Sequence, residues 1–487
     1  MVFLFGAFKS DVPLTRYILP IRASSVCTSD IDLDGDSDII VGHRTGWQKN
    51  NPTISILENS GGLFTIFDTS KSYCGYQENI FTCKIDADPY PDLVTFYYDF
   101  SSGTADRFIR IWYNVNGVFN DFQDFSLNSS ATFTGMTQGD VNGDGLSDIL
   151  VWSADSRFWG VLYNQGNGLL TPPDYHWVTG YYPTIVASGD LNGDGRDDVV
   201  VSGQSTEVYY SFPTGFTAEV LETGNFKDMN AVVDFDGDGD NDLLTAVGIP
   251  IVGVSSLIMY SNQNDTSLLE LPEVYFQPPS LALLATDLNN DSLPDLAFLT
   301  LVPDTSGTGM VDTIGGINIL YNLGNFQLSA PQLLRLKNFD ETTRNFTSAD
   351  LDGNGYNDFA IIRGTGLRIP NLEILFNDGN GNFVGTPVGF VSHPGDEEAP
   401  DLRCCPNPFR EAAAFQFRLT YTTHVDLSVY DSQGRLVQCI LNQQMEQGWH
   451  KIPFALQNET TGRLHGVFFA CMRITGNSSH TIKIIKH

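Results

Sequence analysis

Short apolar segments alternate with acidic, glycine-containing loops along most of the chain. The segment TIVAS leads into one such loop, DVVVS leaves it, and DLVTF leaves another. Segments of this kind, rich in β-branched and aromatic residues, predict two antiparallel strands joined by the loop. A third apolar segment follows, as in TISILEN, GVLYN and INILYN, and usually ends in Asn before a turn with Gly. A fourth segment, such as FTIFDTS, completes a unit of four strands without any helical periodicity.

The acidic loop recurs at a nearly regular interval. Counted at the last Asp of each copy, neighbouring loops lie 44 to 63 residues apart. A four-strand unit that repeats about every fifty residues is typical of a β-propeller blade. Six good copies and a weaker one, KIDADPYPD from Lys84, therefore predict an all-β fold with a seven-bladed propeller. The good copies begin at Asp30, Asp140, Asp190, Asp234, Asp287 and Asp350.

The N-terminal segment does not fit this count directly. Residues 2–19 have the pattern of the last two strands of a blade, although the seventh repeat has such strands of its own. Either this segment closes the ring against the last blade, or an eighth unit lies upstream. We favour closure.

Composition narrows the class of protein. Of the 487 residues, 41% are hydrophobic and 12% aromatic, which indicates packed domains rather than disorder. Asp and Glu number 58 against 26 Lys and Arg, so the formal net charge is -32. This charge repels phosphate backbones, and we expect no nucleic-acid partner. No apolar run reaches the roughly 20 residues that a transmembrane helix needs, and we expect a monomer without a transmembrane segment.

Oxygen-bearing side chains recur within each acidic loop at positions 1, 3, 5 and 9, usually with Gly at position 6. This resembles the first part of an EF-hand loop, where alternate side chains face one cation and position 7 offers a backbone carbonyl. A single copy is also compatible with a solvated polar turn. Six copies in register favour calcium, because the five carboxylates of the loops at Asp30 and Asp234 repel each other without a cation. A catalytic carboxylate pair is disfavoured, because it would not be repeated in every blade.

We therefore predict about six structural calcium ions. Each is held by the side chains at positions 1, 3, 5 and 9 and by the backbone carbonyl at position 7. The predicted ligands are Asp30, Asp32, Asp34, Asp36, Asp38, Asp140, Asn142, Asp144, Leu146, Asp148, Asp190, Asn192, Asp194, Arg196, Asp198, Asp234, Asp236, Asp238, Asp240, Asp242, Asp287, Asn289, Asp291, Leu293, Asp295, Asp350, Asp352, Asn354, Tyr356 and Asp358.

The weaker copy predicts a loop without calcium. Lys84 stands at position 1 and Pro89 at position 6, so a cation replaces a ligand and a fixed negative φ replaces the glycine turn. We expect the Lys84 ammonium to pair with Asp86, Asp88 or Asp92 instead. Ser292 at position 6 of the sixth loop is a milder departure, and we expect that loop still to bind calcium.

The repeated DxDxDGxxD loop followed by an apolar strand resembles the FG-GAP and VCBS repeats, the propeller family that includes the headpiece of integrin α chains. The resemblance covers residues 1–391. It implies a calcium-binding propeller in which the ions stabilise the blades and the ligand sites lie elsewhere, on loops of one face or between blades.

A polar linker, residues 392–401, separates the repeats from residues 402–487, where alternating strands predict a small immunoglobulin-like β-sandwich. Through PNPF, VDLSVYDSQGRLV, QGWHKIPF and the basic end IKIIKH, this region resembles the type A sorting domain of the type IX secretion system. The resemblance implies export to the bacterial cell surface or beyond, with the secretion machinery as a partner. An ordinary immunoglobulin-like accessory domain is the alternative. That route also needs a signal peptide, which this sequence does not show, so we expect the natural start to lie upstream of Met1.

The leading functional hypothesis is a secreted or cell-surface protein for adhesion or carbohydrate binding. Flat aromatic rings in exposed loops stack well on sugar faces, so the candidate ligand residues are Trp47, Tyr97, Tyr98 and Trp152 in connections after the second strand of a blade. The remaining propeller tryptophans, Trp112, Trp159 and Trp177, are expected to pack between blades.

Two other functions stay open. A polysaccharide lyase or another carbohydrate-active enzyme would need an acid or base beside Arg or Lys in one cleft, and basic residues are sparse in the repeats. Only His43 and His176 lie in the repeat region, outside any nucleophile or zinc motif, and we predict no catalytic residue. A structural spacer in a surface assembly is the third possibility.

Overall fold

The structure is a computed structural model, and it describes residues 2–4, 7–8, 15–17, 19, 23–43, 54–59, 62, 64–68, 75–99, 106–127, 131, 133–180, 182–223, 226–249, 254–263, 267–277, 280–303, 313–336, 345–362, 372–384, 403–405, 413–419, 423–431, 436–446, 448–456, 466–474 and 478–486. These residues form β-strands and turns and include no α-helix, which confirms the all-β prediction. The chain divides into two compact units, Met1–Thr386 and Pro387–His487. The predicted linker, residues 392–401, lies outside the described residues.

The described strands of the first unit form seven sheets, each built mainly from four strands consecutive in the chain. The first sheet has β4 (Ala23–Ser29), β5 (Asp38–His43), β6 (Ile54–Asn59) and β7 (Phe64–Asp68); the second has β8 (Gly75–Cys83), β9 (Asp92–Asp99), β10 (Asp106–Val115) and β11 (Val118–Ser126); the third has β12 (Gly135–Gly139), β13 (Asp148–Ser153), β14 (Phe158–Leu162) and β15 (Asp174–Trp177); the fourth has β16 (Ile185–Gly189), β17 (Asp198–Ser202), β18 (Ser205–Phe212) and β19 (Gly215–Thr223).

The remaining three sheets follow the same plan. The fifth has β20 (Met229–Val233), β21 (Asp242–Ile249), β22 (Val254–Asn262), β23 (Leu268–Glu270) and β24 (Val274–Phe276); the sixth has β25 (Ser280–Thr286), β26 (Asp295–Pro303), β27 (Thr313–Leu320) and β28 (Gln332–Leu336); the seventh has β29 (Phe346–Ala349), β30 (Asp358–Ile362), β31 (Leu372–Asn377) and β32 (Phe383–Val384). In every sheet an acidic loop joins the first two strands, and the ninth loop residue is the first residue of the second strand.

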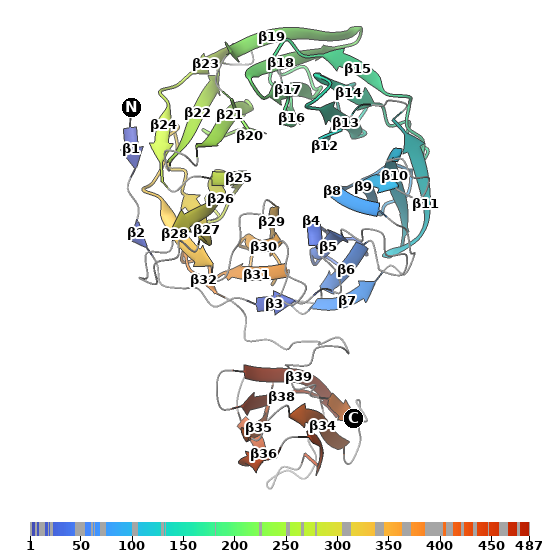
Figure 1. The fold of residues 1–487 in the computed structure, drawn as a ribbon, viewed down its shortest axis with the longest axis vertical. Helices are drawn as coiled ribbons and strands as arrows, with labels where there is room; N and C mark the ends of the chain where they lie inside the picture. Colours follow the sequence, from blue (N-terminus) through green and yellow to red (C-terminus); the bar gives the residue numbers. More distant parts are fainter. Residues whose placement is uncertain are drawn as a thin grey trace. The chain divides into compact units, whose positions relative to one another are not determined.

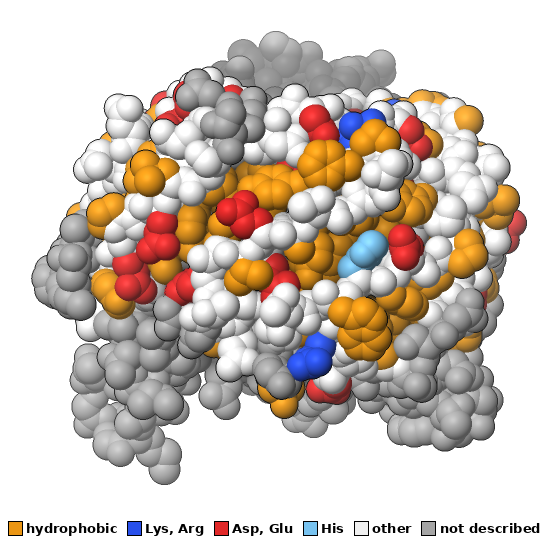
Figure 2. All heavy atoms as spheres, turned by 90° about the horizontal axis from the view of Figure 1, so that it is seen from above, with side chains coloured by type: hydrophobic (Ala, Val, Ile, Leu, Met, Phe, Trp, Pro, Cys, Tyr) orange, Lys and Arg blue, Asp and Glu red, His pale blue; other side chains and the backbone are white. Residues whose placement is uncertain are grey.

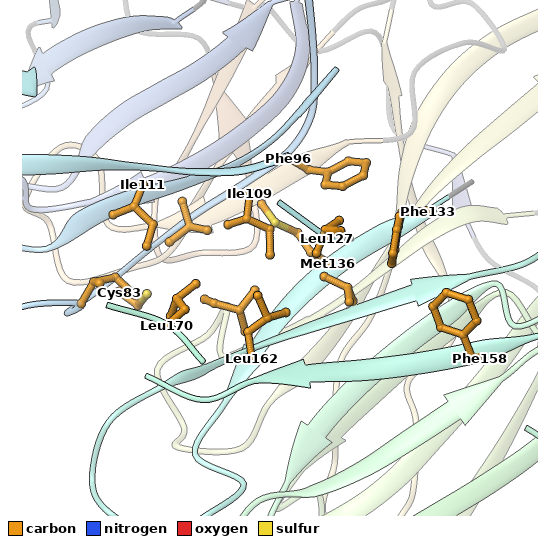
Figure 3. Close-up of a cluster of buried hydrophobic side chains, with 14 residues drawn as sticks. Cys83, Phe96, Ile109, Ile111, Leu127, Phe133, Met136, Phe158, Leu162 and Leu170 are labelled. Atoms are coloured by element: carbon orange, nitrogen blue, oxygen red, sulfur yellow. The ribbon is translucent and has the colours of Figure 1, made fainter. Parts of the chain in front are cut away.

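Within the first unit the sheets stand around a ring, with β4, β8, β12, β16, β20, β25 and β29 nearest its centre (Figure 1). Neighbouring sheets pack face to face and share hydrophobic cores. Figure 3 shows the core between the second and third sheets, where Phe96 and Ile109 meet Phe133, Phe158 and residues around them. Since the middle strands are covered on both sides, they read as continuous apolar runs such as DILVW. This packing makes the first unit propeller-like.

The N-terminal segment adds strands to three of these sheets. β1 (Val2–Leu4) pairs parallel with β24, and β2 (Ala7–Phe8) pairs parallel with β28. β3 (Thr15–Tyr17) pairs antiparallel with β31 of the seventh sheet, and the chain then enters β4 of the first sheet. The described part of the N-terminal segment therefore links the last sheet to the first, as the closure hypothesis predicts.

The second unit consists of two antiparallel sheets among its described residues. One contains β33 (Arg403–Cys405), β34 (Ala413–Leu419) and β37 (Gly448–Phe454); the other contains β35 (Thr423–Asp431), β36 (Leu436–Met445), β38 (Gly466–Ile474) and β39 (Ser478–Lys486). A single hydrophobic core joins the two sheets, with Phe415 and Phe454 from one and Leu427 and Met472 from the other.

Candidate metal loops and exposed aromatic residues

The first carboxylate of each good loop organises that loop around itself. In the third loop (residues 140–148), Oδ1 of Asp140 accepts the backbone N–H of Gly143 at 2.8 Å, and Oδ2 accepts that of Gly145 at 2.8 Å. Gly143 and Gly145 have φ values of 71° and 84°, a left-handed conformation that glycine adopts easily. The same pair of bonds forms at Asp190, Asp234 and Asp350.

The sixth loop (residues 287–295) keeps this geometry without either glycine. Asn290 and Ser292 take the left-handed conformation at φ 61° and 72°. Their backbone N–H groups donate to Oδ1 and Oδ2 of Asp287 at 2.7 and 2.8 Å. Ser292 therefore leaves the arrangement of the loop intact, although a non-glycine residue in this conformation carries some strain.

The ninth carboxylate of each loop is buried at the start of the second strand. In the first loop (residues 30–38), Oδ2 of Asp38 accepts the N–H of Ile31 at 2.9 Å, and Oδ1 accepts the N–H of Asn59 at 2.7 Å. Burial raises the pKa of these carboxyl groups, because the charged form is poorly solvated there. The pKa is about 6 for Asp38, Asp92 and Asp242 and about 7 for Asp148, Asp198, Asp295 and Asp358.

Carboxylate oxygens at positions 1, 3 and 9 gather in three loops. In each group the candidate ligand atoms lie within 4.8 Å of one another. Calcium binds oxygens at about 2.3 to 2.6 Å, so two ligands on opposite sides of one ion stand roughly 4.6 to 5.2 Å apart, and the groups match that size. The groups are Asp30, Asp32 and Asp38; Asp234, Asp236 and Asp242; and Asp350, Asp352 and Asp358.

The third, fourth and sixth loops have Asn142, Asn192 or Asn289 at position 3, and an amide oxygen there is also a calcium ligand. In the third loop Asp148 is fully buried, and its Oδ2 has no hydrogen-bond partner in the part of the chain that the structure describes. A buried carboxylate oxygen without a partner is costly. A cation held by this loop would satisfy it.

The second loop (residues 84–92) contains none of the gathered carboxylate groups. Asp92 accepts the N–H groups of Ile85 and Asn114 at 3.0 and 2.9 Å, as its counterparts do in other loops. The expected ion pair of Lys84 is not formed, since Lys84 is exposed and no carboxylate of this loop lies within ion-pair distance of it in the described structure. An exposed ion pair would contribute little stability, so its absence costs the loop little.

One residue at or near the end of each third strand connects two neighbouring loops, and we call these seven the bridging residues. The backbone N–H of each donates to the ninth carboxylate of its own loop at 2.6 to 2.9 Å. In the six asparagines, Nδ2 donates at 2.6 to 3.1 Å to a backbone carbonyl of the preceding loop. The bridging residues are Asn59, Asn114, Asn164, Ser211, Asn262, Asn322 and Asn377.

The acceptor is usually the second residue of the preceding loop, which lies between the predicted ligands at positions 1 and 3. Asn59 closes the set, because its Nδ2 donates to the carbonyl of Leu351 in the seventh loop at 3.0 Å. Ser211 makes the equivalent bond through its hydroxyl group to the carbonyl of Val141. Asn164 differs slightly, since it donates to Lys84 at position 1 of the second loop. These residues can be recognised in the sequence as the recurrent Asn that ends the third segment. The carbonyl groups that they bind cannot be recognised there.

The predicted ligand-binding aromatics are not together on an exposed loop. Trp152 is only 6% exposed, lies in β13 and donates through Nε1 to the carbonyl of Thr184 at 3.1 Å. Its prediction as an exposed ligand residue is wrong, because β13 extends to Ser153 and is covered by sheets on both sides. Tyr97 and Tyr98 belong to strand β9 rather than to a loop. Trp47 lies outside the described residues.

Of the three tryptophans expected to pack between blades, two are buried and one is exposed. Trp112 and Trp159 are fully buried, and His176 stacks on Trp159 with the two ring centroids 4.6 Å apart. Trp177 is 71% exposed, so the prediction for this residue is wrong. It is the last residue of the outer strand β15, where no further strand covers it, and it contacts only the edge of Phe158 among the described rings.

Two more exposed aromatics, Tyr182 and Phe226, lie in connections between sheets and are 57% and 46% exposed. Tyr182 has φ 54°, an uncommon conformation for a bulky residue. Its carbonyl packs so closely on Gly203 that a Cβ there would stand 2.1 Å from it. The backbone of Tyr182 therefore packs on Gly203, while its ring is exposed. Sequence reasoning missed both residues, since a Gly- and Pro-containing connection gives no sign of which side chain faces solvent.

Glu207 binds the backbone of the connection that contains Tyr182. It is buried and accepts hydrogen bonds from the N–H groups of Thr179 and Gly180 at 3.1 and 2.8 Å, from Ser205 at 2.6 Å and from Tyr209 at 2.8 Å. Burial alone raises the pKa of Glu207, but these hydrogen bonds outweigh it and hold the pKa below its ordinary value.

Figure 2, seen from the β19 side of Figure 1, shows apolar side chains in a hollow with more acidic than basic groups around it.

Comparison with known proteins supports the repeat. Residues 84–151 and 140–201 match the family model of the FG-GAP-like repeat, and no curated protein matches the chain. Among solved structures, an Agrocybe aegerita lectin that recognises non-reducing terminal N-acetylglucosamine is 16% identical over 64% of this chain and 80% of its own, with a TM-score of 0.36. The described residues contain no helix able to span a membrane. Residues 84–201 of this all-β, propeller-like unit are therefore similar to FG-GAP-like repeats.

Proposed function

We propose that the first unit is a seven-bladed β-propeller stabilised by about six calcium ions, and that it serves as a binding module at the bacterial cell surface or in the secreted state. The carrying observation is the gathering of carboxylate oxygens at positions 1, 3 and 9 within 4.8 Å in three loops. The bound ions would neutralise clusters that otherwise repel each other, and their chemistry is structural rather than catalytic.

Calcium content is the direct test of this proposal. The full chain, purified in calcium and passed through a desalting column, should retain about six ions per molecule by elemental analysis, one for each good loop. Ions that bind only the folded state stabilise it, so chelation should lower the melting temperature. Fewer than about two ions per chain, or a melting temperature that chelation leaves unchanged, would contradict the calcium assignment.

For the binding role, the proposed ligand is a neutral glycan, with a protein ligand as the alternative. Trp177 and Tyr182 present flat rings to solvent, and such rings stack well on sugar faces. The net charge of -32 disfavours acidic polysaccharides. We expect binding on a glycan array that Trp177→Ala weakens and Leu323→Ala, an exposed residue in a turn of the sixth sheet, does not. Equal binding by both variants would move the glycan site elsewhere, and cleavage of a glycan would favour the enzyme hypothesis.

The second unit is proposed to be an immunoglobulin-like sandwich that directs export through the type IX system. Its support is the pair of sheets around one core together with the motifs from PNPF to IKIIKH. In a host that carries this system, deletion of residues 402–487 should retain the protein inside the cell envelope. Unchanged export of the shortened chain would leave the second unit as an accessory domain.

A further inference from the structure

The seventh and first loops meet through Asn59. Its backbone N–H holds Asp38, the ninth residue of the first loop, at 2.7 Å. Its Nδ2 holds the carbonyl of Leu351 at 3.0 Å, between Asp350 and Asp352 of the seventh loop. All these atoms are buried, and both loops contain one of the gathered carboxylate groups.

The turn that follows Asn59 makes a second contact with the seventh loop. The N–H of Gly62 donates to Oδ1 of Asn59 at 2.9 Å, which fixes the side-chain amide. Gly62 also packs on Asp352, since a Cβ at Gly62 would stand 3.1 Å from the Cβ of Asp352. Both the amide plane of Asn59 and the backbone beside Asp352 are therefore set by the same short turn.

We propose that Asn59 couples the two calcium loops that it joins, so that an ion in one loop raises the calcium affinity of the next. The bridging residues that join two other calcium loops, Ser211, Asn262, Asn322 and Asn377, act in the same way. This rests on the proposed calcium function and adds cooperativity to it. Asn59 acts as a positioning residue, because it orders a ligand of one loop through the backbone of the other without touching the ion.

The coupling arises because an ion bound in one loop reduces the conformational freedom of the next loop. An ion in the seventh loop fixes Asp350, Asp352 and the carbonyl between them, and this fixes the Asn59 amide. The Asn59 N–H then holds Asp38 in place before the first loop has bound its own ion. A ligand that binds an already ordered site loses less conformational entropy, which is positive cooperativity without a change of fold. By reciprocity, the first loop favours the seventh equally.

The effect should have the size of about one hydrogen bond. Such a bond contributes about 0.5 to 1.5 kcal/mol net, which corresponds to a change of roughly two- to twelvefold in affinity. The bridge at Ser211 shows that a hydroxyl group can replace the amide, since Ser211 reaches the carbonyl of Val141 in the same way.

Tyr356 gives a reporter for one loop. It stands at position 7 of the seventh loop, where its ring can sensitise the luminescence of a bound terbium ion, a common substitute for calcium. Terbium is titrated into the full chain with excitation of tyrosine, and the emission that Tyr356→Phe abolishes is taken as the occupancy of the seventh loop. Asp32→Ala then removes a ligand from the first loop, and Asp36→Ala, which keeps its backbone carbonyl, controls for the loss of one charge.

Asp32→Ala should weaken terbium binding at the seventh loop by roughly two- to twelvefold more than Asp36→Ala does. In an Asn59→Ala background the two variants should have equal effects, and Asn59→Ser should restore the difference. If Asn59→Ala does not fold, Asn59→Leu takes its place, because Leu has a similar shape but no group that can donate to the carbonyl of Leu351. Equal effects of the two Asp variants in the wild-type chain would overturn the coupling. A chain that shows no Tyr356-dependent signal, and from which calcium displaces no terbium, would overturn the calcium function instead.

Discussion

The backbone N–H of Asn164 donates to Oδ1 of Asp148 at 2.8 Å, whereas Oδ2 of the same buried carboxylate has no hydrogen-bond partner among the described residues. Asp92 occupies the corresponding place in the second loop, but both of its oxygens accept backbone N–H groups. The two carboxylates differ at Oδ2, and position 1 is Asp140 in the third loop but Lys84 in the second. Of these two loops, the third therefore has the full set of predicted ligands and the second does not.

Substitution of these two residues should separate structural from metal-binding roles. Asp148→Asn should reduce the calcium content by one ion per chain, because a charged ligand of the third loop is lost. Asp92→Asn should leave the calcium content unchanged and should be destabilised by about 1 to 3 kcal/mol, because its Nδ2 cannot accept one of the two backbone N–H groups that Asp92 accepts. Elemental analysis and denaturant unfolding measure the two effects. An ion lost from Asp92→Asn would show that the second loop binds calcium after all.

Acidity should stabilise the calcium-free protein. Burial raises the pKa of Asp148 to about 7 and that of Asp38 to about 6, from the ordinary value of 3.8. Between pH 3.8 and the raised pKa values of about 6 and about 7, the folded state binds more protons than the unfolded state. The free energy of unfolding therefore falls as the pH rises through this window. In chelator, the melting temperature should therefore be higher near about pH 5 than near about pH 8.

Calcium should reverse this trend, because protons and calcium compete for the same carboxylates. The gain in melting temperature from added calcium should be large near about pH 8 and small near about pH 5. Glu207 does not disturb the comparison, since its pKa is lowered from 4.5 and its contribution is lost only at lower pH. A calcium-induced gain independent of pH would mean that these buried carboxylates do not take part in calcium binding.

The strands and loops could be predicted from the sequence because their signals are local. Each acidic loop contains its own turn residues, and the run DILVW after Asp148 is apolar because both faces of β13 are covered. The bridging bonds could not be predicted, since Asn59 and its partner Leu351 are 292 positions apart. Only closure of the ring brings them together.

The aromatic residues show a second limit. Trp152 and Trp177 both follow apolar or aromatic neighbours, yet one is 6% and the other 71% exposed. The difference depends on strand order within the sheet, because β13 is a middle strand and β15 an outer one. A local pattern does not contain this information, so the predicted ligand surface was wrong at Trp152.

Glu207 should be essential for the stability of the connection that presents Tyr182. Glu207→Gln removes the charge that accepts four hydrogen bonds and should cost about 1.5 to 3 kcal/mol in free energy of unfolding. Glu219→Gln is the matched control, because Glu219 is exposed on β19 and accepts one hydrogen bond from Tyr210. Urea unfolding compares the variants, and equal stability would show that the Glu207 network contributes nothing net.

Substitution of Trp159 should lower the stability of the fold, whereas substitution of Trp177 should weaken glycan binding without lowering stability. Trp159 is fully buried between the third and fourth sheets, so Trp159→Ala should lower the free energy of unfolding by about 3 to 5 kcal/mol. Trp177→Ala should change it by less than about 0.5 kcal/mol, because an exposed side chain leaves no cavity. Chemical denaturation in saturating calcium measures both. If Trp177→Ala were as destabilising as Trp159→Ala, its ring would be part of the core, and any loss of glycan binding in that variant would report unfolding rather than a missing contact.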